Sequence, residues 1–187
     1  MSSGFVLPPT SGRLVRGGAL DITVKVGGDR SRDFSAFEAR VPPGFDVGAH
    51  RHAAGEEMFL VLEGELEMFA FDPQPTSDAD WRTWSDGDGQ RVSRGGPGTV
   101  MFIPSGCAHG FRNETDEVAR VFFVVSPVGH EDYLRELADL LATTGPDVAA
   151  IDAIRSRHGI EQLTPMRPGR PVDLHHTHPP VGDRTIS

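Results

Sequence analysis

Alternating apolar and polar residues dominate the chain between residues 19 and 126. Residues 22–26 and 34–41 each carry apolar side chains at every second position. Because side chains two apart in a strand point to the same side, each run predicts a strand with one buried face. Residues 57–71 have the strongest β pattern and predict a hairpin that turns at Gly64.

Three more short apolar runs, at residues 99–103, 109–112 and 118–126, predict further strands and bring the total to roughly eight. Residues 72–97 lie between two of these runs. They begin with a polar, proline-containing stretch and contain a glycine-rich turn at residues 85–89, which predicts an irregular insertion followed by a short hairpin.

The periodicity changes after Pro127. Leucines and Tyr133 recur three and four positions apart over residues 133–141, which predicts an amphipathic helix. A second helix is expected to open at Pro146 and to stop at Gly159. We therefore divide the chain into an N-terminal arm (1–18), a barrel (19–128) and a C-terminal segment of two helices and a Pro/His-rich tail (129–187).

The composition fits one all-β domain with appendages. The chain has 187 residues, of which 37% are hydrophobic and 24% charged, with 22 Gly and 15 Pro. A net charge of -9 without a basic cluster argues against nucleic acid as a partner. The chain has one cysteine, Cys107, and its N-terminus does not resemble a signal peptide, which predicts a cytoplasmic protein. It has no apolar run long enough to span a membrane, so we expect it outside the membrane.

Three histidines and a glutamate occur at spacings that a barrel would bring together. His50 and His52 share one face of a strand, although that pair alone fits a solvent-facing strand equally well. Glu57 opens the next strand after a short link, so we expect an adjacent antiparallel strand to bring its carboxylate to the same wall. His109 is expected from a different strand pair. Three imidazoles and a carboxylate suit a first-row divalent metal with an open position.

Two stretches carry a family resemblance. Residues 44–64, which contain His50, His52 and Glu57, and residues 98–113, which contain His109 and end at Asn113, match the two signature motifs of the cupin superfamily. More broadly, the chain resembles single-domain quercetin-dioxygenase-like cupins. The resemblance implies a jelly-roll β-barrel, often dimeric, with these three histidines and Glu57 as metal ligands. Thr99, where many relatives have aspartate, and the long spacing between the motifs depart from the pattern without touching the ligands.

Strand parity also predicts the walls of a substrate pocket. Phe59 and Val61 share parity with Glu57, and Phe111 shares parity with His109, so these three are expected to line the pocket as well as the core. Glu56 is expected at the surface. Trp81 and Trp84 fit either a lid over the barrel mouth, a dimer contact or packing of the hairpin.

The other histidines have simpler interpretations. His130 and His158 fall near helix ends, where solvent exposure or an interaction with the helix terminus is the ordinary role. The tail cluster of His175, His176 and His178 lies in a Pro-rich terminus, which is more often mobile or a packing segment than a metal site.

The leading functional hypothesis is a metal-dependent dioxygenase that acts on a small aromatic or enolisable substrate, with O2 as co-substrate and Glu57 as general base. The alternatives are a metal-dependent isomerase, cyclase or lyase, because Lewis-acid polarisation and a carboxylate suffice for proton abstraction, and a non-catalytic cupin that binds a small ligand. The ligand set accepts iron, manganese, nickel, cobalt, copper or zinc. A homodimer is expected.

Overall fold

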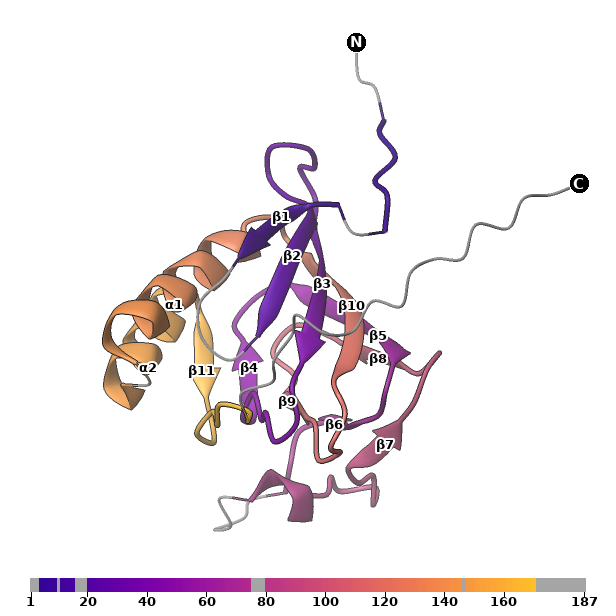
Figure 1. Cartoon of the computed structure of the whole chain (residues 1–187). Coiled ribbons are helices and arrows are strands. Elements are labelled where there is room, and N and C mark those ends of the chain that lie inside the picture. Colours follow the sequence, from indigo (N-terminus) through magenta and orange to yellow (C-terminus); the bar gives the residue numbers. More distant parts are fainter. Residues whose placement is uncertain (1–3, 10, 16–19, 75–79, 146, 171–187) are drawn as a thin grey trace, which may run out of the picture.

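The computed structural model describes residues 4–9, 11–15, 20–74, 80–145 and 147–170, and it contains two antiparallel sheets that face each other (Figure 1). The first sheet has the strand order β1-β2-β3-β10-β5-β8. Its strands are β1 (Arg13–Val15), β2 (Asp21–Val26), β3 (Ser35–Val41), β10 (Ala119–Ser126), β5 (Glu56–Glu63) and β8 (Val100–Ile103).

The second sheet has the order β11-β4-β9-β6-β7. Its strands are β11 (Ile160–Gln162), β4 (His50–His52), β9 (His109–Arg112), β6 (Leu66–Ala70) and β7 (Ser93–Gly95). The predicted all-β jelly-roll barrel with two C-terminal helices is confirmed. Consecutive strands of the chain alternate between the two sheets at several places, as in β4 to β5 and β5 to β6.

The core lies between the sheets and follows the alternation of the strands. In β10 every second residue is buried, and Phe123 stacks on Phe37 of β3 and on Phe59 of β5 at ring centroid distances of 4.7 and 5.0 Å. Burial of such aromatic rings contributes most of the favourable free energy of folding of a small sandwich. A cavity lined by residues of both sheets lies beside this core.

Two helices pack together beside β1 and β11 (Figure 1). They are α1 (His130–Thr144) and α2 (Val148–Arg157), close to the bounds predicted from periodicity. The start of α1 is anchored to the barrel, because the Glu131 carboxylate accepts hydrogen bonds from the Gly28 amide (2.6 Å) and the Ser35 hydroxyl (2.5 Å). Among the described residues, no helix is long and apolar enough to span a membrane.

Two short strands lie in regions that the sequence did not mark as part of the barrel. β1 falls within the predicted arm, and β11 follows the second helix and pairs with β4, with Ile160 opposite His52 and Gln162 opposite His50. The division into arm, barrel and C-terminal segment otherwise stays a prediction. His175, His176 and His178 lie outside the described residues.

The segment of residues 80–92, between the two motifs, packs on the outside of the second sheet. It contains the 3-10 turn η1 (Trp81–Thr83) and a single bridge between Ser85 and Arg91, in place of the predicted hairpin strands. Trp81 and Trp84 are buried against Phe69 in a second apolar cluster, and the Trp81 indole donates a hydrogen bond of 3.0 Å to Asp46 Oδ1. Of the three sequence-based alternatives for the tryptophans, the structure shows packing.

Replacing Trp81 with alanine is therefore expected to destabilise the fold by about 3–5 kcal/mol without altering the metal content of the folded protein. Trp81 is only 2% exposed, so the change removes a large buried ring and a hydrogen bond. Chemical denaturation gives the free energy of unfolding. As a control, Phe102→Ala at a 55% exposed position should stay within about 0.5 kcal/mol of the parent. An equal, small effect in both variants would contradict the packing role.

Candidate metal centre

Three histidine rings meet on the inner face of the second sheet. His50 on β4 lies directly opposite His109 on β9, with ring centroids 4.2 Å apart. The ring of His52 lies 5.3 Å from His50 and 5.4 Å from His109. The two histidines of β4 thus share one face, as strand parity predicts, and strand pairing brings the third beside them.

Glu57 reaches the same point from the opposite sheet. We predicted that β5 would lie beside β4 and that His109 would come from elsewhere, but β5 pairs with β10 and β8, and β9 is the neighbour of β4. The link of residues 53–55 crosses between the sheets. Glu57 Oε1 lies 3.0 Å from His52 Nδ1, and Oε2 lies 3.6 Å from His109 Nε2.

Gly55 makes this crossing possible. Its φ of +92° is in the left-handed region, and a Cβ at this position would overlap the carbonyl oxygen of Ser126. No other residue fits here without a shift of the β10 backbone. Gly55 therefore sets the path by which Glu57 arrives two residues later.

Gly55→Ala is expected to lower the free energy of unfolding by about 2–4 kcal/mol, because it combines left-handed strain with a backbone clash. Gly106→Ala is the matched control. Gly106 also has a positive φ (+80°), but a Cβ there would meet open space, so only about 1 kcal/mol of backbone strain is expected. Denaturant titration of both variants measures the difference, and equal losses would show that the clash is relieved.

Backbone carbonyls fix the tautomers of two of the histidines. His50 Nδ1 lies 2.9 Å from Gly48 O, and His109 Nδ1 lies 3.0 Å from Cys107 O. Since a carbonyl oxygen only accepts, each Nδ1 carries a hydrogen, and in the neutral ring Nε2 then has the lone pair that a metal needs. An imidazole oriented in this way by a second hydrogen bond is the usual form of a histidine that binds a metal.

Burial lowers the pKa of two of the imidazoles, and the neighbouring rings lower the pKa of the carboxylate. Burial, reinforced by the neighbouring His109, holds the pKa of His50 well below its ordinary value. Burial likewise lowers the pKa of His52, although Glu57 opposes it. Burial disfavours the Glu57 anion, but the imidazoles of His109 and His52 outweigh it and lower the pKa of Glu57 to about 2.

Two polar atoms at the centre of this cluster lack a hydrogen-bond partner within the described residues. They are Glu57 Oε1, which His52 Nδ1 approaches without the alignment of a hydrogen bond, and His109 Nε2. Buried polar atoms are normally satisfied, so unpartnered ones of the metal-ligating type fit a bound cation. The donor set of imidazole nitrogens and a carboxylate oxygen suits a divalent transition metal.

The described residues form two overlapping groups in which the potential ligand atoms all lie within 4.8 Å of one another. One consists of His50, His52 and His109, and the other of His52, Glu57 and His130. Each of the four residues predicted from sequence belongs to one of these groups, and His52 belongs to both, but His50 and Glu57 share none. His130, which the sequence placed at a helix end with an ordinary role, lies beside them.

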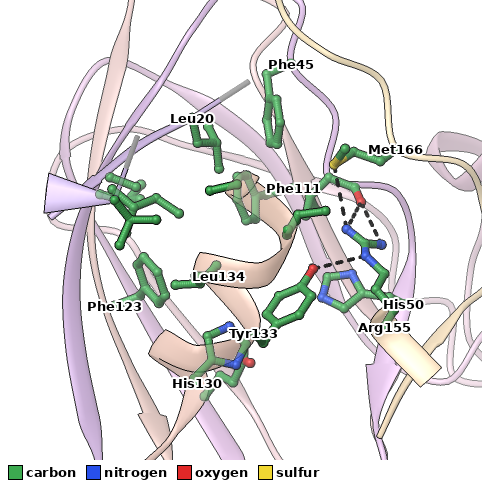
Figure 2. A pocket seen from close by; sticks show the side chains of 18 of the residues that line it. Leu20, Phe45, His50, Phe111, Phe123, His130, Tyr133, Leu134, Arg155 and Met166 are labelled. Carbon is green, nitrogen blue, oxygen red and sulfur yellow. Dashed lines mark hydrogen bonds between the residues drawn. The ribbon is translucent and has the colours of Figure 1, made fainter. Parts of the chain in front are cut away.

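His130 is the first residue of α1 and points into the barrel (Figure 2). Its ring stacks on His52 at 5.5 Å and lies 5.1 Å from Tyr133. Burial lowers the pKa of His130 to about 4. The apolar periodicity of α1 contains the signal that would have found it, because residue 130 lies three and four positions before Tyr133 and Leu134 and therefore on the same helix face.

A mostly apolar cavity of about 90 Å³ opens beside the cluster (Figure 2). Its walls come from both sheets and from α1, which contributes Tyr133 and Leu134. Phe59 and Phe111 line it, as predicted. Val61 is buried in the core but does not reach the cavity, because parity predicts the face of a strand and not the depth along it.

The remaining sequence candidates have structural roles. Glu56 is exposed, as expected. Asn113 supports the end of β9, since its amide nitrogen donates to Val41 O and Glu117 O at 2.8 and 2.7 Å. His158 ends α2 and lies 3.4 Å from the exposed Glu136. Cys107 is partly buried and packs on the core, away from the cavity lining.

The sequence profile of the cupin family matches residues 23–148. This range includes both motifs and all five clustered side chains, which are His50, His52, Glu57 and His109 of the barrel and His130 of α1. The chain belongs to the cupin family. This cupin is 30% identical over 127 residues to the "Polyketide synthase CurC" of Streptomyces cyaneus, an alignment that covers 68% of each protein.

Solved structures share the fold at lower identity. The polyketide cyclase RemF from Streptomyces resistomycificus matches with a TM-score of 0.50 and 21% identity, over 66% of this chain and 80% of that one. An RmlC-like cupin from Shewanella frigidimarina matches with a TM-score of 0.51 and 18% identity, over 71% and 99% of the two chains. At these identities the likeness concerns the fold alone.

Proposed function

We propose that this cupin is a metal-dependent cyclase that acts on a small, enolisable, polyketide-like substrate. The observation that carries the proposal is the buried cluster of His50, His52, His109 and Glu57, with unpartnered ligand atoms, at the edge of an apolar cavity. The 30% identical relative named as a polyketide synthase supports the choice of substrate class.

In this proposal the four residues predicted from sequence hold one divalent ion. Such an ion, when bound, supplies Lewis-acid polarisation of a substrate carbonyl and makes an adjacent C–H more acidic. The protein contributes the rest. Phe59 and Phe111 exclude water and hold the carbon skeleton, and His130, on the α1 side of the cavity, takes the proton from the carbon that will form the new bond.

The roles of the two basic groups differ. The carboxylate of Glu57 lies between the imidazoles of His52 and His109. His130 belongs to α1 and lies outside the three-histidine group. We therefore assign the general-base role to His130, and Glu57, the base proposed from sequence, serves as a ligand. The deprotonated carbon attacks a second carbonyl carbon of the substrate, and the proton held by His130 passes to the oxygen of that carbonyl, which becomes a hydroxyl. His130 then takes the second proton of the same methylene carbon and returns it to this hydroxyl, which leaves as water as the C=C bond forms.

A single assay tests the proposal against the dioxygenase and binding-module hypotheses. The purified protein is loaded in turn with each of the metals predicted from sequence and incubated with a synthetic poly-β-carbonyl thioester while dissolved oxygen is monitored. Loss of one water from the substrate, detected by mass spectrometry without oxygen uptake, is the expected result. Gain of two oxygen atoms with oxygen uptake would instead identify a dioxygenase. Unchanged substrate with every metal would contradict both enzymatic hypotheses.

The homodimer stays a prediction.

A further inference from the structure

Arg155 is a buried cation in the wall of the cavity. It comes from α2, is only 1% exposed and lines the same cavity as His50 and Tyr133 (Figure 2). The guanidinium group stays protonated at any physiological pH. Removing such a charge from water is strongly unfavourable unless an opposite charge compensates it.

The partners of Arg155 are all neutral. Its Nε donates to Tyr133 Oη at 3.1 Å, and its two terminal nitrogens reach Val47 O at 3.5 and 3.4 Å, which are long for hydrogen bonds. One of them also lies 3.7 Å from Met166 Sδ. Within the described residues, no carboxylate oxygen lies within 4.0 Å of this group, and Glu57, the carboxylate of the same cavity, lies against His52 and His109.

Tyr133 extends this positive site into the cavity. Its hydroxyl oxygen accepts from Arg155, and no acceptor for its own hydrogen is found in the described part of the chain. Burial raises the pKa of Tyr133, although the charge of Arg155 opposes this, so the hydroxyl keeps its hydrogen at neutral pH. A phenol that accepts from a guanidinium group is a stronger donor to a further oxygen, because hydrogen bonds in a chain polarise one another.

We propose that Tyr133 and Arg155 form a subsite for an ionised carboxylate of the substrate. The negative charge compensates the buried guanidinium, one carboxylate oxygen accepts from the Tyr133 hydroxyl, and the apolar walls take the attached carbon skeleton. The subsite deepens the proposed function, on which its relevance to catalysis rests, because it predicts that a poly-β-carbonyl thioester that also carries a free carboxylate is the preferred substrate. Binding at the subsite itself requires no turnover.

Titration calorimetry with benzoate and benzamide tests the subsite, because the two probes have nearly the same shape and differ in charge. The full-length protein, as purified, is expected to bind benzoate about tenfold or more tightly than benzamide. Arg155→Met should abolish this preference, and Tyr133→Phe should weaken benzoate binding about tenfold. Arg157→Met, an exposed arginine of the same helix that pairs with Glu136, is the matched control and should keep the preference.

Thermal unfolding separates this role from a structural one. Replacing a buried charge without a counter-ion by the apolar methionine chain is expected to preserve or raise the melting temperature, whereas an arginine needed to hold α2 would lower it. If Arg155→Met does not fold, Tyr133→Phe decides, since it removes a single oxygen. Equal binding of the two probes by the parent protein, an unchanged preference in Arg155→Met, or unchanged benzoate affinity in Tyr133→Phe would overturn the proposal.

The two proposals fail separately. If the parent protein prefers benzoate but leaves every poly-β-carbonyl compound unchanged, the carboxylate subsite is supported and the cyclase proposal is contradicted. If the protein cyclises the thioester but binds both probes equally, the cyclase proposal is supported and the subsite is contradicted.

Discussion

His52→Ala is expected to reduce metal affinity at least about a hundredfold. His52 belongs to both groups of potential ligands, so its loss leaves neither group complete. Loss of an outer-shell partner already costs about 10- to 100-fold in affinity, and a direct ligand contributes more. Elemental analysis of the purified protein and a competitive titration with a chromogenic chelator give the metal content and the Kd.

His158→Ala is the control for this variant. His158 lies at the end of α2 against Glu136, outside both groups, and its removal should leave the metal content unchanged. Circular dichroism shows whether each variant is folded. Equal metal retention in folded His52→Ala and His158→Ala would contradict the assignment of the metal centre and the chemistry proposed for it.

His130→Gln is expected to lower kcat for cyclisation by about a hundredfold or more while the metal content stays at the parent level. A positioned general base contributes roughly 10²- to 10⁴-fold, and glutamine keeps a polar side chain of similar reach that cannot accept the proton as effectively. The two readouts are the rate of water loss from the thioester and elemental analysis.

This pair of readouts distinguishes a base from a ligand. A fall in metal content as large as that of His52→Ala would place His130 in the ligand set of the second group and would contradict its role as base. An unchanged kcat would contradict the role directly. His158→Gln, also on the helical segment, should alter neither quantity.

Strand parity predicted much of the site. It placed His50 and His52 on one face, because the two-residue repeat of a strand depends only on local backbone geometry. The motif spacing to Gly64 and the apolar run after Glu57 selected buried Glu57 over exposed Glu56. The family motifs then predicted that His109 would join them. These inferences required no knowledge of which strands are neighbours.

Strand pairing was not accessible in the same way. The short link between His52 and Glu57 is compatible with a hairpin as well as with a crossing between sheets, and the contact of Gly55 with the distant Ser126 that distinguishes them is not visible in a local pattern. β1 and β11 are three residues long, too short for an alternation to be recognised.

The contribution of the two helices to the site was missed for a related reason. His130 and Arg155 belong to α1 and α2, which we treated as an appendage, whereas one face of α1 and Arg155 of α2 line the cavity. A histidine at the start of a helix and an arginine near the end of one have ordinary roles at exposed termini. Only the packing of the helices against the barrel reveals that these two side chains point inward.

The pairing of β4 with β11 affects when the centre can form during synthesis. All three histidines of the first group and Glu57 are translated by residue 109, but the strand that completes the edge of β4 comes only at Ile160–Gln162. A nascent chain that ends before α2 therefore exposes the ligands on an unfinished sheet, without Arg155 or β11 beside them. Domains generally fold as units as the chain emerges, so we expect the proposed ion to bind only after the C-terminal segment has been translated, and a chain that ends before α2 to bind it weakly.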